Sequence, residues 1–359
     1  MIEIDGSYLE GGGQIVRTAL AFSALTGKNI QIKNIRKGRS QPGLKKQHLA
    51  AVNALKDICD AEVYGNELGS SSLMFKPASL TFRNLNIDIG TAGSITLLLQ
   101  ALLPVILFSD KRLKIQIEGG TDTLGSMPVD YFQNVFLPHI SKYARIDSKL
   151  ERRGYYPKGG GKLTLRIKPK YFRKNHAGFI DFMSFLRKED KKIFLPEQGN
   201  LLAVFGRSHA SMDLMKANVS ERQAKAAKFF LGNLDCSKKI DIEYTETKSS
   251  GSGVALWAVF SKFDEMNKEN PVILGADCLG KKGKKSEKIG EEASKKLLEE
   301  IRSGGAADSH LADQLLPYLA LFGGEIKSSR ITDHCRTNIY VIEKILGTKY
   351  NMTNNLIII

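Results

Sequence analysis

Three stretches of this chain share one order of predicted elements, and this repetition limits the fold more than any other feature of the sequence. Each stretch shows strand and helix periodicities in the order β-α-β-α-β-β, although the third has no obvious first strand. The repeats cover about residues 1–78, 80–170 and 306–359. Alternating helical and strand periods favour an α/β (α+β) fold in which helices cover the sheets.

The residues between the second and third repeats have a different character. Residues 171–199 read as a connector of mixed charge, and residues 200–303 predict a small inserted α/β domain. A chain of 359 residues then divides into a catalytic three-repeat domain (1–199 and 304–359) and this insert.

Two local patterns of the insert suggest specific structures. Strand-like segments at 240–247 and 254–261 flank the Gly/Ser turn KSSGSG, a pattern typical of a hairpin. The segment GADCLGKK, which starts at Gly275, nearly matches a P-loop, but Lys282 stands where the metal-binding hydroxyl should be. We therefore expect a hairpin and no P-loop.

The charge and composition of the chain limit the classes of partner that it is expected to bind. There are 53 Lys+Arg against 38 Asp+Glu, so the formal net charge of +15 favours a polyanionic partner, with a Lys-rich solubilising surface as the alternative. The four cysteines form no CxxC pair, so we expect reduced thiols and a cytoplasmic location. The apolar stretch 95–108 is too short to span a bilayer, and we expect no membrane partner. The oligomeric state stays open.

Strand-to-helix junctions of the first repeat carry candidate sites, because helix N-termini present free N–H groups to anions. The turn EGGGQIVR holds Glu10, which suits a metal, and Arg17; a plain tight turn is the alternative. The loop IRKGRSQPGLKKQH carries Arg36 and Arg39, which can bind phosphate bidentately, followed by Gln47. A solvated basic loop is the alternative here.

In the second repeat, Gln100 interrupts an apolar helix, the loop GGTD supplies Asp122, and RRGYYPKGGGKL contains three glycines. Each has a structural alternative. Gln100 could be a core amide with a hydrogen-bond partner, GGTD could be only a turn, and RRGYYPKGGGKL could be a hairpin turn.

In the third repeat, polar clusters precede two helices. His310 is followed by Asp313 and Gln314, for which helix capping is the alternative. His334 lies at a strand–loop–helix junction that corresponds to the arginine loop of the first repeat. A lone histidine is often structural, so this residue alone leaves both interpretations open.

Seven motifs, in order, resemble the RNA 3′-terminal phosphate cyclase family and cover nearly the whole chain outside the insert. They are EGGGQIVRTAL (10–20), IRKGRSQPGLKKQHL (35–49), GTAGSITLLLQALLP (90–104), GGTD (119–122), RGYYPKGGG (153–161), HLADQLLPYLAL (310–321) and HCRTNI (334–339). The resemblance implies a large domain of three repeats similar to the C-terminal domain of bacterial initiation factor 3, with a smaller inserted domain.

The resemblance also implies a reaction. An RNA 3′-phosphate end becomes a 2′,3′-cyclic phosphate, with ATP and Mg²⁺ or Mn²⁺ as cofactors and AMP and pyrophosphate as products. His334 matches the family's nucleophile, which attacks the α-phosphorus of ATP and forms a histidine–AMP adduct. The adenylyl group then passes to the RNA 3′-phosphate, and the neighbouring 2′-hydroxyl closes the ring.

Other roles follow by position in the matched motifs. Glu10 matches the metal-binding acid, and His310 stands where some family members have Tyr. The implied ATP site comprises Gln100, Pro128, Tyr131, His310, Leu311, Ala312, Asp313 and Gln314, and the implied RNA or phosphate site comprises Arg17, Arg36, Arg39 and Gln47.

Two other classes of function compete with this one. A cyclase-like RNA-binding factor in ribosome or rRNA maturation would perform no adenylylation, and family relatives of that kind lack the nucleophilic histidine. A small-molecule transferase built from similar repeats, such as an enolpyruvyl transferase, is disfavoured by the His334 motif and the +15 charge.

Overall fold

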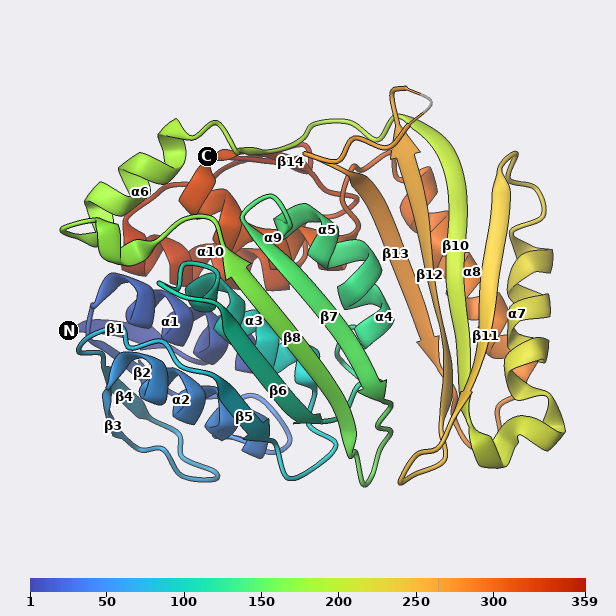
Figure 1. Ribbon diagram of the computed structural model, residues 1–359, viewed down its shortest axis with the longest axis horizontal. Helices are drawn as coiled ribbons and strands as arrows, with labels where there is room; N and C mark the ends of the chain where they lie inside the picture. Colours follow the sequence, from blue (N-terminus) through green and yellow to red (C-terminus); the bar gives the residue numbers. More distant parts are fainter. Residues whose placement is uncertain (264) are drawn as a thin grey trace.

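The first repeat follows the predicted order of elements. In the computed structural model, which describes residues 1–263 and 265–359 (Figure 1), its elements are β1 (Ile2–Asp5), α1 (Gly13–Thr26), β2 (Ile30–Lys33), α2 (Lys46–Cys59), β3 (Glu62–Tyr64) and β4 (Leu73–Lys76). Helix α1 ends at Gly27, whose φ of 74° is the left-handed conformation that favours glycine after a helix. Nearly every residue of α1 is buried, so this helix lies inside the fold.

The second repeat departs from the sequence prediction in its second helix. Its elements are β5 (Leu85–Asp88), α3 (Ile95–Ile106), β6 (Leu113–Gly119), α4 (Val129–Tyr131), the π-helical turn η1 (Phe132–Phe136), α5 (Leu137–Ile140), β7 (Ala144–Arg152) and β8 (Gly161–Pro169). The sequence predicts one continuous helix over residues 129–144. Pro138 has no N–H to donate to the preceding turn, which is a physical reason for the interrupted α-helical pattern.

The third repeat does have a first strand, and the connector supplies it. The connector contains η2 (Arg173–Asn175), α6 (Phe179–Lys188) and β9 (Ile193–Leu195); the repeat continues after the insert with α9 (Ser309–Phe322), β14 (Gly324–Lys327), α10 (Asp333–Leu346), β15 (Asn351–Thr353) and β16 (Leu356–Ile358). Strand β9 pairs in parallel with β14, and beyond the insert Ala307 forms a parallel bridge with Ser328. The insert therefore interrupts the third repeat between its first strand and first helix.

The three repeats share one sheet topology. Their strand orders are β1-β2-β4-β3, β5-β6-β8-β7 and β9-β14-β16-β15. In each sheet the first two strands of the order are parallel and the remaining neighbours are antiparallel. The α/β (α+β) fold of repeated units expected from the sequence is confirmed.

The insert forms a fourth sheet, and the predicted hairpin within it is wrong. Its elements are β10 (Asn200–Ser211), η3 (Met212–Ala217), α7 (Val219–Phe230), β11 (Ser237–Thr245), β12 (Ser252–Ser261), β13 (Val272–Leu279) and α8 (Ser286–Arg302). The strand order is β11-β10-β12-β13, so β10 separates the two strands that the turn KSSGSG joins. Strand β10 pairs in parallel with β11, through the α7 crossover, and antiparallel with β12.

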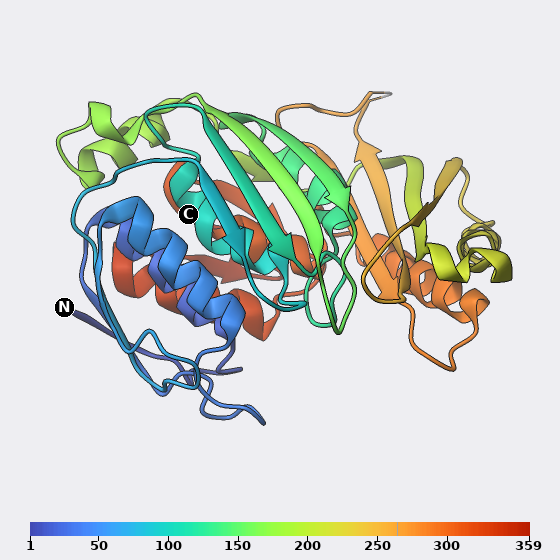
Figure 2. The same cartoon turned by 60° about the horizontal axis from the view of Figure 1, so that its bottom comes forward.

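Two separate groups of buried apolar side chains support the division into a three-repeat body and an insert, which we keep as a proposal. The larger group joins the repeats, whose helices α1, α3, α9 and α10 contact one another. The smaller group lies between the insert sheet and helices α7 and α8. Figures 1 and 2 place the insert at the end of the molecule opposite α6 and the N-terminus.

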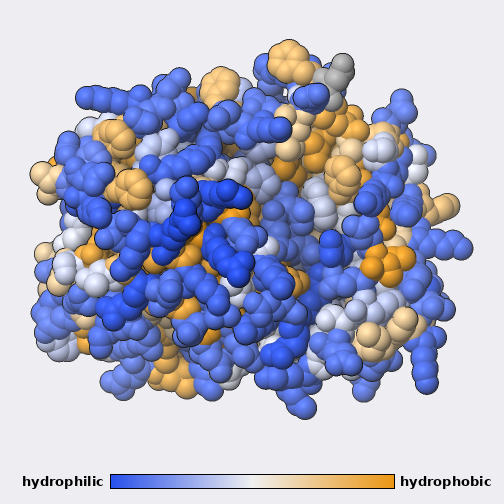
Figure 3. Space-filling view, viewed as in Figure 1, coloured by the Kyte–Doolittle hydropathy of each residue, from blue (hydrophilic) through white to orange (hydrophobic). Residues whose placement is uncertain are grey.

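The surface is mostly polar. The face shown in Figure 3 is covered largely by hydrophilic side chains, and β7 and β8 present Lys149, Arg166 and Lys168 to solvent. None of the described helices combines the length and apolar character needed to cross a membrane.

Candidate active site

A basic cleft of about 720 Å³ lies where loops of the first two repeats meet the start of α10. Among the described residues that line it, Glu10 is the single acid, against Arg17, Arg36, Arg39 and Lys45. Such an excess of positive charge in a concave site suits an anionic ligand.

His334 lies at the edge of this cleft, in the first turn of α10. This helix begins at Asp333, earlier than predicted, and the Thr332 hydroxyl oxygen accepts a hydrogen bond from the Cys335 N–H at 3.2 Å. The His334 Nδ1 atom is hydrogen-bonded to Gln14 Oε1, and its Nε2 atom lies 3.0 Å from Glu10 Oε2.

Electrostatics favour a neutral His334. Burial is the largest influence and lowers the pKa of His334 below the ordinary value of 6.5; the Glu10 carboxylate opposes this shift, and Arg17 reinforces it. A neutral imidazole has one nitrogen lone pair. Because Gln14 Oε1 is an acceptor, it favours the proton on Nδ1, but the Glu10 carboxylate, 3.0 Å from Nε2, would repel a lone pair on that nitrogen. Nε2 can therefore act as a nucleophile only when Glu10 has turned away.

Helix α1 begins inside the cleft without a capping side chain. Its N-cap residue is Gly12, which makes no side-chain capping bond, so the first backbone N–H groups remain free for an anion. Gly13 is required by close packing, since a Cβ atom at this position would lie 2.1 Å from His48 Nε2. His48 Nδ1 accepts a hydrogen bond from the Lys45 N–H, and burial lowers the His48 pKa to about 3. Its Nε2 atom is therefore a neutral N–H donor beside the start of α1.

Arg17 connects the cleft with a small cavity of about 20 Å³ beneath it. Only 8% of Arg17 is exposed, and its Nε atom has no hydrogen-bond partner among the described residues. Burial lowers the Arg17 pKa to about 10, with Asp313 opposing the shift. Burial raises the pKa of Asp313 to about 8, and Arg17 opposes that shift. Within the described structure, Arg17 is thus only partly compensated, by Asp313.

The other three residues matched to RNA or phosphate binding, Arg36, Arg39 and Gln47, occupy different parts of the same cleft. Arg36 has a φ of 55°, and its Nη1 atom donates to the carbonyl oxygens of Gln41 at 2.7 Å and Gly43 at 3.0 Å. Part of its guanidinium therefore shapes the loop. Gln47 Oε1 accepts a hydrogen bond from the Ser94 N–H at 3.3 Å, which links the first repeat to the start of α3. Arg39 lies 3.4 Å from Glu10.

The residues matched to ATP fall into two groups. Gln100, Asp313 and Gln314 line the small cavity with Arg17, and His310 is exposed at the start of α9. The remaining residues are buried away from the lining of both cavities: Pro128, Tyr131, Leu311 and Ala312. The assignment of this second group to ATP contact stays a prediction, and their burial favours support of the site.

Gln14 is a cleft residue that the sequence analysis did not select, and Lys45 and His48 entered it only as part of the loop IRKGRSQPGLKKQH, without a role of their own. Gln14 follows the glycine turn, one helical turn after Glu10, and His48 directly follows Gln47. Their positions next to residues matched to the family were the sequence signal that could have indicated a place in the site. Their roles depend on helix packing, since α10 and α1 must meet before Gln14 can reach His334.

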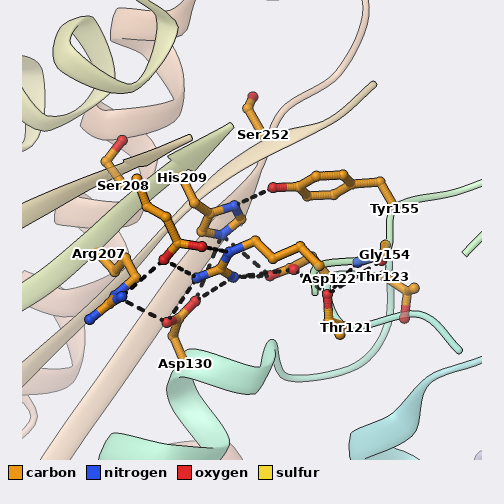
Figure 4. Close-up of polar contacts among 12 residues, drawn as sticks. Thr121, Asp122, Thr123, Asp130, Gly154, Tyr155, Arg207, Ser208, His209 and Ser252 are labelled. Carbon is orange, nitrogen blue, oxygen red and sulfur yellow. Dashed lines mark hydrogen bonds and ion pairs between the residues drawn. The ribbon is translucent and has the colours of Figure 1, made fainter. Parts of the chain in front are cut away.

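A second group of charged side chains joins the insert to the second repeat (Figure 4). We call it the Arg153 cluster; Arg153 donates to Asp130 at 2.7 Å and to Glu243 at 2.7 Å, and lies 3.3 Å from Asp122. His209 completes it, with Nδ1 hydrogen-bonded to the Tyr155 hydroxyl at 2.7 Å and Nε2 3.3 Å from Asp122. Arg207 pairs with Glu243 at 2.9 Å.

Carboxylates of the Arg153 cluster pair with its guanidinium groups, although Asp130, Arg153, Arg207 and Glu243 also line a cavity of about 490 Å³. Within the described structure, His209 Nε2 and Arg207 Nε have no hydrogen-bond partner. Burial opposes charge on Arg153, yet its carboxylate partners raise the Arg153 pKa well above the ordinary value. Asp122, Asp130 and His209 present atoms within 4.8 Å of one another, a spacing that could hold a metal ion. The Arg153 guanidinium already takes the place of a cation there, so we assign the cluster a structural role.

The fold and the cleft define an α/β protein of three repeated units with a basic cleft and a histidine at its edge. A family model described as RNA 3′-terminal phosphate cyclase matches residues 8–352. Proteins named RNA 3′-terminal phosphate cyclase from Pyrococcus abyssi and Methanosarcina mazei are 42% and 40% identical to this chain. The alignments cover 98% of this chain in both cases, and 95% and 97% of the relatives. The chain belongs to the RNA 3′-terminal phosphate cyclase family, which confirms the resemblance found in its motifs.

Proposed function

We propose that this chain uses ATP to convert an RNA 3′-terminal phosphate to a 2′,3′-cyclic phosphate, through an AMP adduct on His334 and an RNA-adenylate. As a family member, the chain is an RNA 3′-terminal-phosphate cyclase, an ATP-dependent ligase that acts in RNA processing. The observation that carries the finer mechanism is the position of His334, held by Gln14 at the edge of a cleft with an excess of positive charge.

In the first step, the Nε2 lone pair of His334 attacks the α-phosphorus of ATP. A P–N bond forms, the bond from the α-phosphorus to the bridging oxygen breaks, and pyrophosphate leaves with that electron pair. The imidazole ring gains positive charge, and Gln14 Oε1 stabilises it by accepting the Nδ1–H hydrogen bond. Glu10 must turn away from Nε2 to admit the phosphorus, and Arg39 offers the carboxylate another partner at 3.4 Å.

In the later steps, an oxygen of the RNA 3′-phosphate attacks the adenylyl phosphorus and releases His334. The 2′-hydroxyl oxygen then attacks the activated RNA phosphorus, and its proton passes to solvent. The bond from that phosphorus to the bridging oxygen breaks, and AMP leaves with the electron pair. Covalent geometry holds the 2′-hydroxyl close to the phosphorus, so little further positioning is required. The free N–H groups at the start of α1, with Arg17 and Arg39, supply the positive charge that binds the phosphates.

The carboxylate in the cleft suits a divalent cation. Mg²⁺ is commonly held by one or two carboxylates together with substrate phosphates, and Glu10 provides one carboxylate facing the cleft. When bound, Mg²⁺ or Mn²⁺ would neutralise charge on the triphosphate. Glu10 is the residue that we propose as its protein ligand.

Incubation with labelled ATP and Mg²⁺ or Mn²⁺ tests the proposal. We expect an acid-labile protein–AMP adduct in the wild type and none in His334→Ala, and adduct turnover only with oligonucleotides that carry a 3′-phosphate. A wild-type protein that never acquires AMP would contradict the mechanism. RNA binding without detectable ATP binding would instead support a non-catalytic RNA-binding factor.

A further inference from the structure

A buried carboxylate connects the insert to the helix that carries the proposed nucleotide site. Asp308 is 0% exposed and precedes α9 as its N-cap residue. Its Oδ1 atom accepts hydrogen bonds from the N–H groups of His310 and Leu311, both at 2.9 Å. These bonds cap the helix in the usual way and fix its first turn.

The other oxygen of Asp308 faces the insert. Its Oδ2 atom accepts a hydrogen bond from the backbone N–H of Gly275 in β13 at 2.8 Å. The Tyr131 hydroxyl lies 2.8 Å from Oδ1 and 3.0 Å from Oδ2, so it donates between the two oxygens. One carboxylate therefore joins α9, α4 and the insert strand β13, which come from distant parts of the chain.

The contact between β13 and α4 is tight enough to be specific. A Cβ atom on Gly275 would lie 2.4 Å from Tyr131 Cε2, so only glycine allows the strand to approach this closely. The Tyr131 ring is 1% exposed. Tyr131 and Gly275 thus hold Asp308 in a closely packed contact.

The first turns of α9 carry the groups that this contact would position. Asp313 and Gln314 line the cavity beside Arg17, and His310 is exposed at the helix start. On its other side, α9 is held by Asn338, whose Nδ2 donates to the Asp313 carbonyl oxygen at 2.8 Å. The nucleotide end of α9 is therefore anchored twice, once to the repeats and once to the insert.

We propose that Asp308 is a positioning residue for ATP, through which strand β13 of the insert sets the placement of the nucleotide end of α9. This inference rests on the proposed function, because it takes α9 as part of the ATP site. It gives the insert a task in the reaction without contact to substrate. Small displacements of groups that orient a substrate are costly, so the effect is expected on ATP use.

Asp308→Asn isolates the connection to the insert. Asparagine keeps an oxygen that can cap α9, but its NH₂ group replaces the acceptor that faces the Gly275 N–H. In self-adenylylation we expect the KM for ATP to rise about tenfold with kcat within about threefold of wild type. Tyr131→Phe keeps the ring and removes one donor, and we expect a KM increase of about threefold. Asp235→Asn, an exposed change in the same insert, is the matched control.

Binding measurements separate this inference from the proposed function. ATP affinity is measured by calorimetry with an analogue that cannot be cleaved at the α–β bridge, and affinity for a 3′-phosphorylated oligonucleotide is measured in parallel. We expect Asp308→Asn to weaken analogue binding about tenfold and RNA binding less than twofold. A wild type that binds the analogue but forms no adduct would contradict only the proposed function.

Three results would overturn the positioning role. One is a KM and analogue affinity in Asp308→Asn within twofold of wild type. Another is an equal loss of RNA and nucleotide binding with a lowered Tm, which would indicate a general folding defect. If Asp308→Asn does not fold, an unchanged KM in Tyr131→Phe decides against the proposal.

Discussion

The cleft and the Arg153 cluster each place a histidine among arginines and carboxylates, but they balance their charges differently. In the cleft, Glu10 is the only acid among the described lining residues, and the buried Nε of Arg17 has no hydrogen-bond partner in the described structure. In the Arg153 cluster, Asp122, Asp130 and Glu243 all surround one guanidinium. The difference between the regions is one of charge, since Arg207 Nε and His209 Nε2 in the cluster also lack hydrogen-bond partners among the described residues. The excess of positive charge in the cleft can be balanced by an anionic ligand, whereas carboxylates of the protein already balance the Arg153 guanidinium.

The two buried arginines show this contrast in their pKa values. Burial lowers the pKa of Arg17 to about 10, because Asp313 compensates it only in part. Burial also acts on Arg153, but the carboxylates override it and its pKa lies well above the ordinary value. A phosphate bound in the cleft would supply Arg17 with the compensating negative charge that protein carboxylates already supply to Arg153.

Exchange of the two histidines for alanine gives the largest expected difference between the regions. His334→Ala removes the proposed nucleophile, so we expect self-adenylylation to fall at least about 10³-fold with little change in stability. His209→Ala removes the partner of the Tyr155 hydroxyl, so we expect a loss of about 2 kcal/mol in the free energy of unfolding.

Adduct formation with labelled ATP and chemical denaturation measure these two effects. Adenylylation of His209→Ala should stay within about threefold of wild type, since His209 lies outside the cleft. A comparable loss of adenylylation in both variants would contradict the assignment of His334 to the active site and of His209 to a structural cluster.

Replacement of each buried arginine by methionine tests the difference in charge balance. Arg153→Met leaves carboxylates buried without a partner, so we expect about 3–5 kcal/mol of destabilisation. Arg17→Met removes a poorly compensated buried charge, so we expect a change below about 1 kcal/mol.

Denaturant unfolding of both variants, with adenylylation rates in parallel, checks this expectation. Arg17→Met should lose at least about tenfold in adenylylation despite its stability. An Arg17→Met protein destabilised as strongly as Arg153→Met would show that Arg17 is also a structural charge.

Arg39 allows a finer division within the cleft. We expect Arg39→Ala to weaken the use of 3′-phosphorylated RNA ends about tenfold more than self-adenylylation, because its guanidinium stands at the open side beside Glu10. Arg36→Ala should act in the same direction, with an added effect on the loop that Arg36 holds through Gln41 and Gly43. Arg166→Ala, on the exposed face of β8, is the control.

Single-turnover rates for adduct formation and for RNA cyclisation provide the two readouts. Equal losses in both steps would mean that these arginines serve ATP or folding rather than the RNA end.

The smallest effect concerns pH, where the two regions respond with opposite sign. Asp313 has a pKa raised to about 8, so its contribution to stability is full below its ordinary value of 3.8 and is lost as the pH rises through 8. Burial alone would raise the pKa of Glu243, but the hydrogen bonds and charges of Arg153 and Arg207 together outweigh it and lower the pKa to about 2. The contribution of Glu243 to stability is present above pH 4.5 and is lost as the pH falls through 2.

Unfolding free energies between pH 2 and pH 9 check both signs. We expect Asp313→Asn to flatten the decline between pH 4 and 8, and Glu243→Gln to flatten the decline at acid pH, each by on the order of 1 kcal/mol. A pH profile unchanged in Asp313→Asn would show that this carboxyl is ionised and compensated in the native state.

The repeats could be predicted from sequence because their helices are long and periodic, but short or central strands could not. Strand β9 is only Ile193–Leu195, too short to establish a period within a polar connector. The hairpin prediction failed because adjacency in sequence favours pairing, whereas β10 is a twelve-residue central strand that takes a partner on both sides.

The convergence of the candidate residues could be expected from the sequence, while their roles stay predictions. Glu10, Arg17, Arg36, Arg39 and His334 do converge on one cleft. Roles that depend on tertiary contacts were not visible in the sequence. The Tyr131 hydroxyl meets Asp308, and Gln14 meets His334, across separations that no local pattern encodes.

The register of β14 also bears on how this chain came to be. Leu195 pairs with Ile326, and Ala307 pairs with Ser328. After the insert the chain therefore returns to the same side of β14 and resumes parallel pairing two residues further along that strand. In the second repeat, Asp88 pairs with Glu118 and Ser94 bridges Gly120 in the same manner, with residues 89–93 as the excursion. Residues 196–306 are thus an enlarged version of an ordinary loop. An ancestor with three equal repeats could have acquired the insert in one event, without disturbance of any sheet.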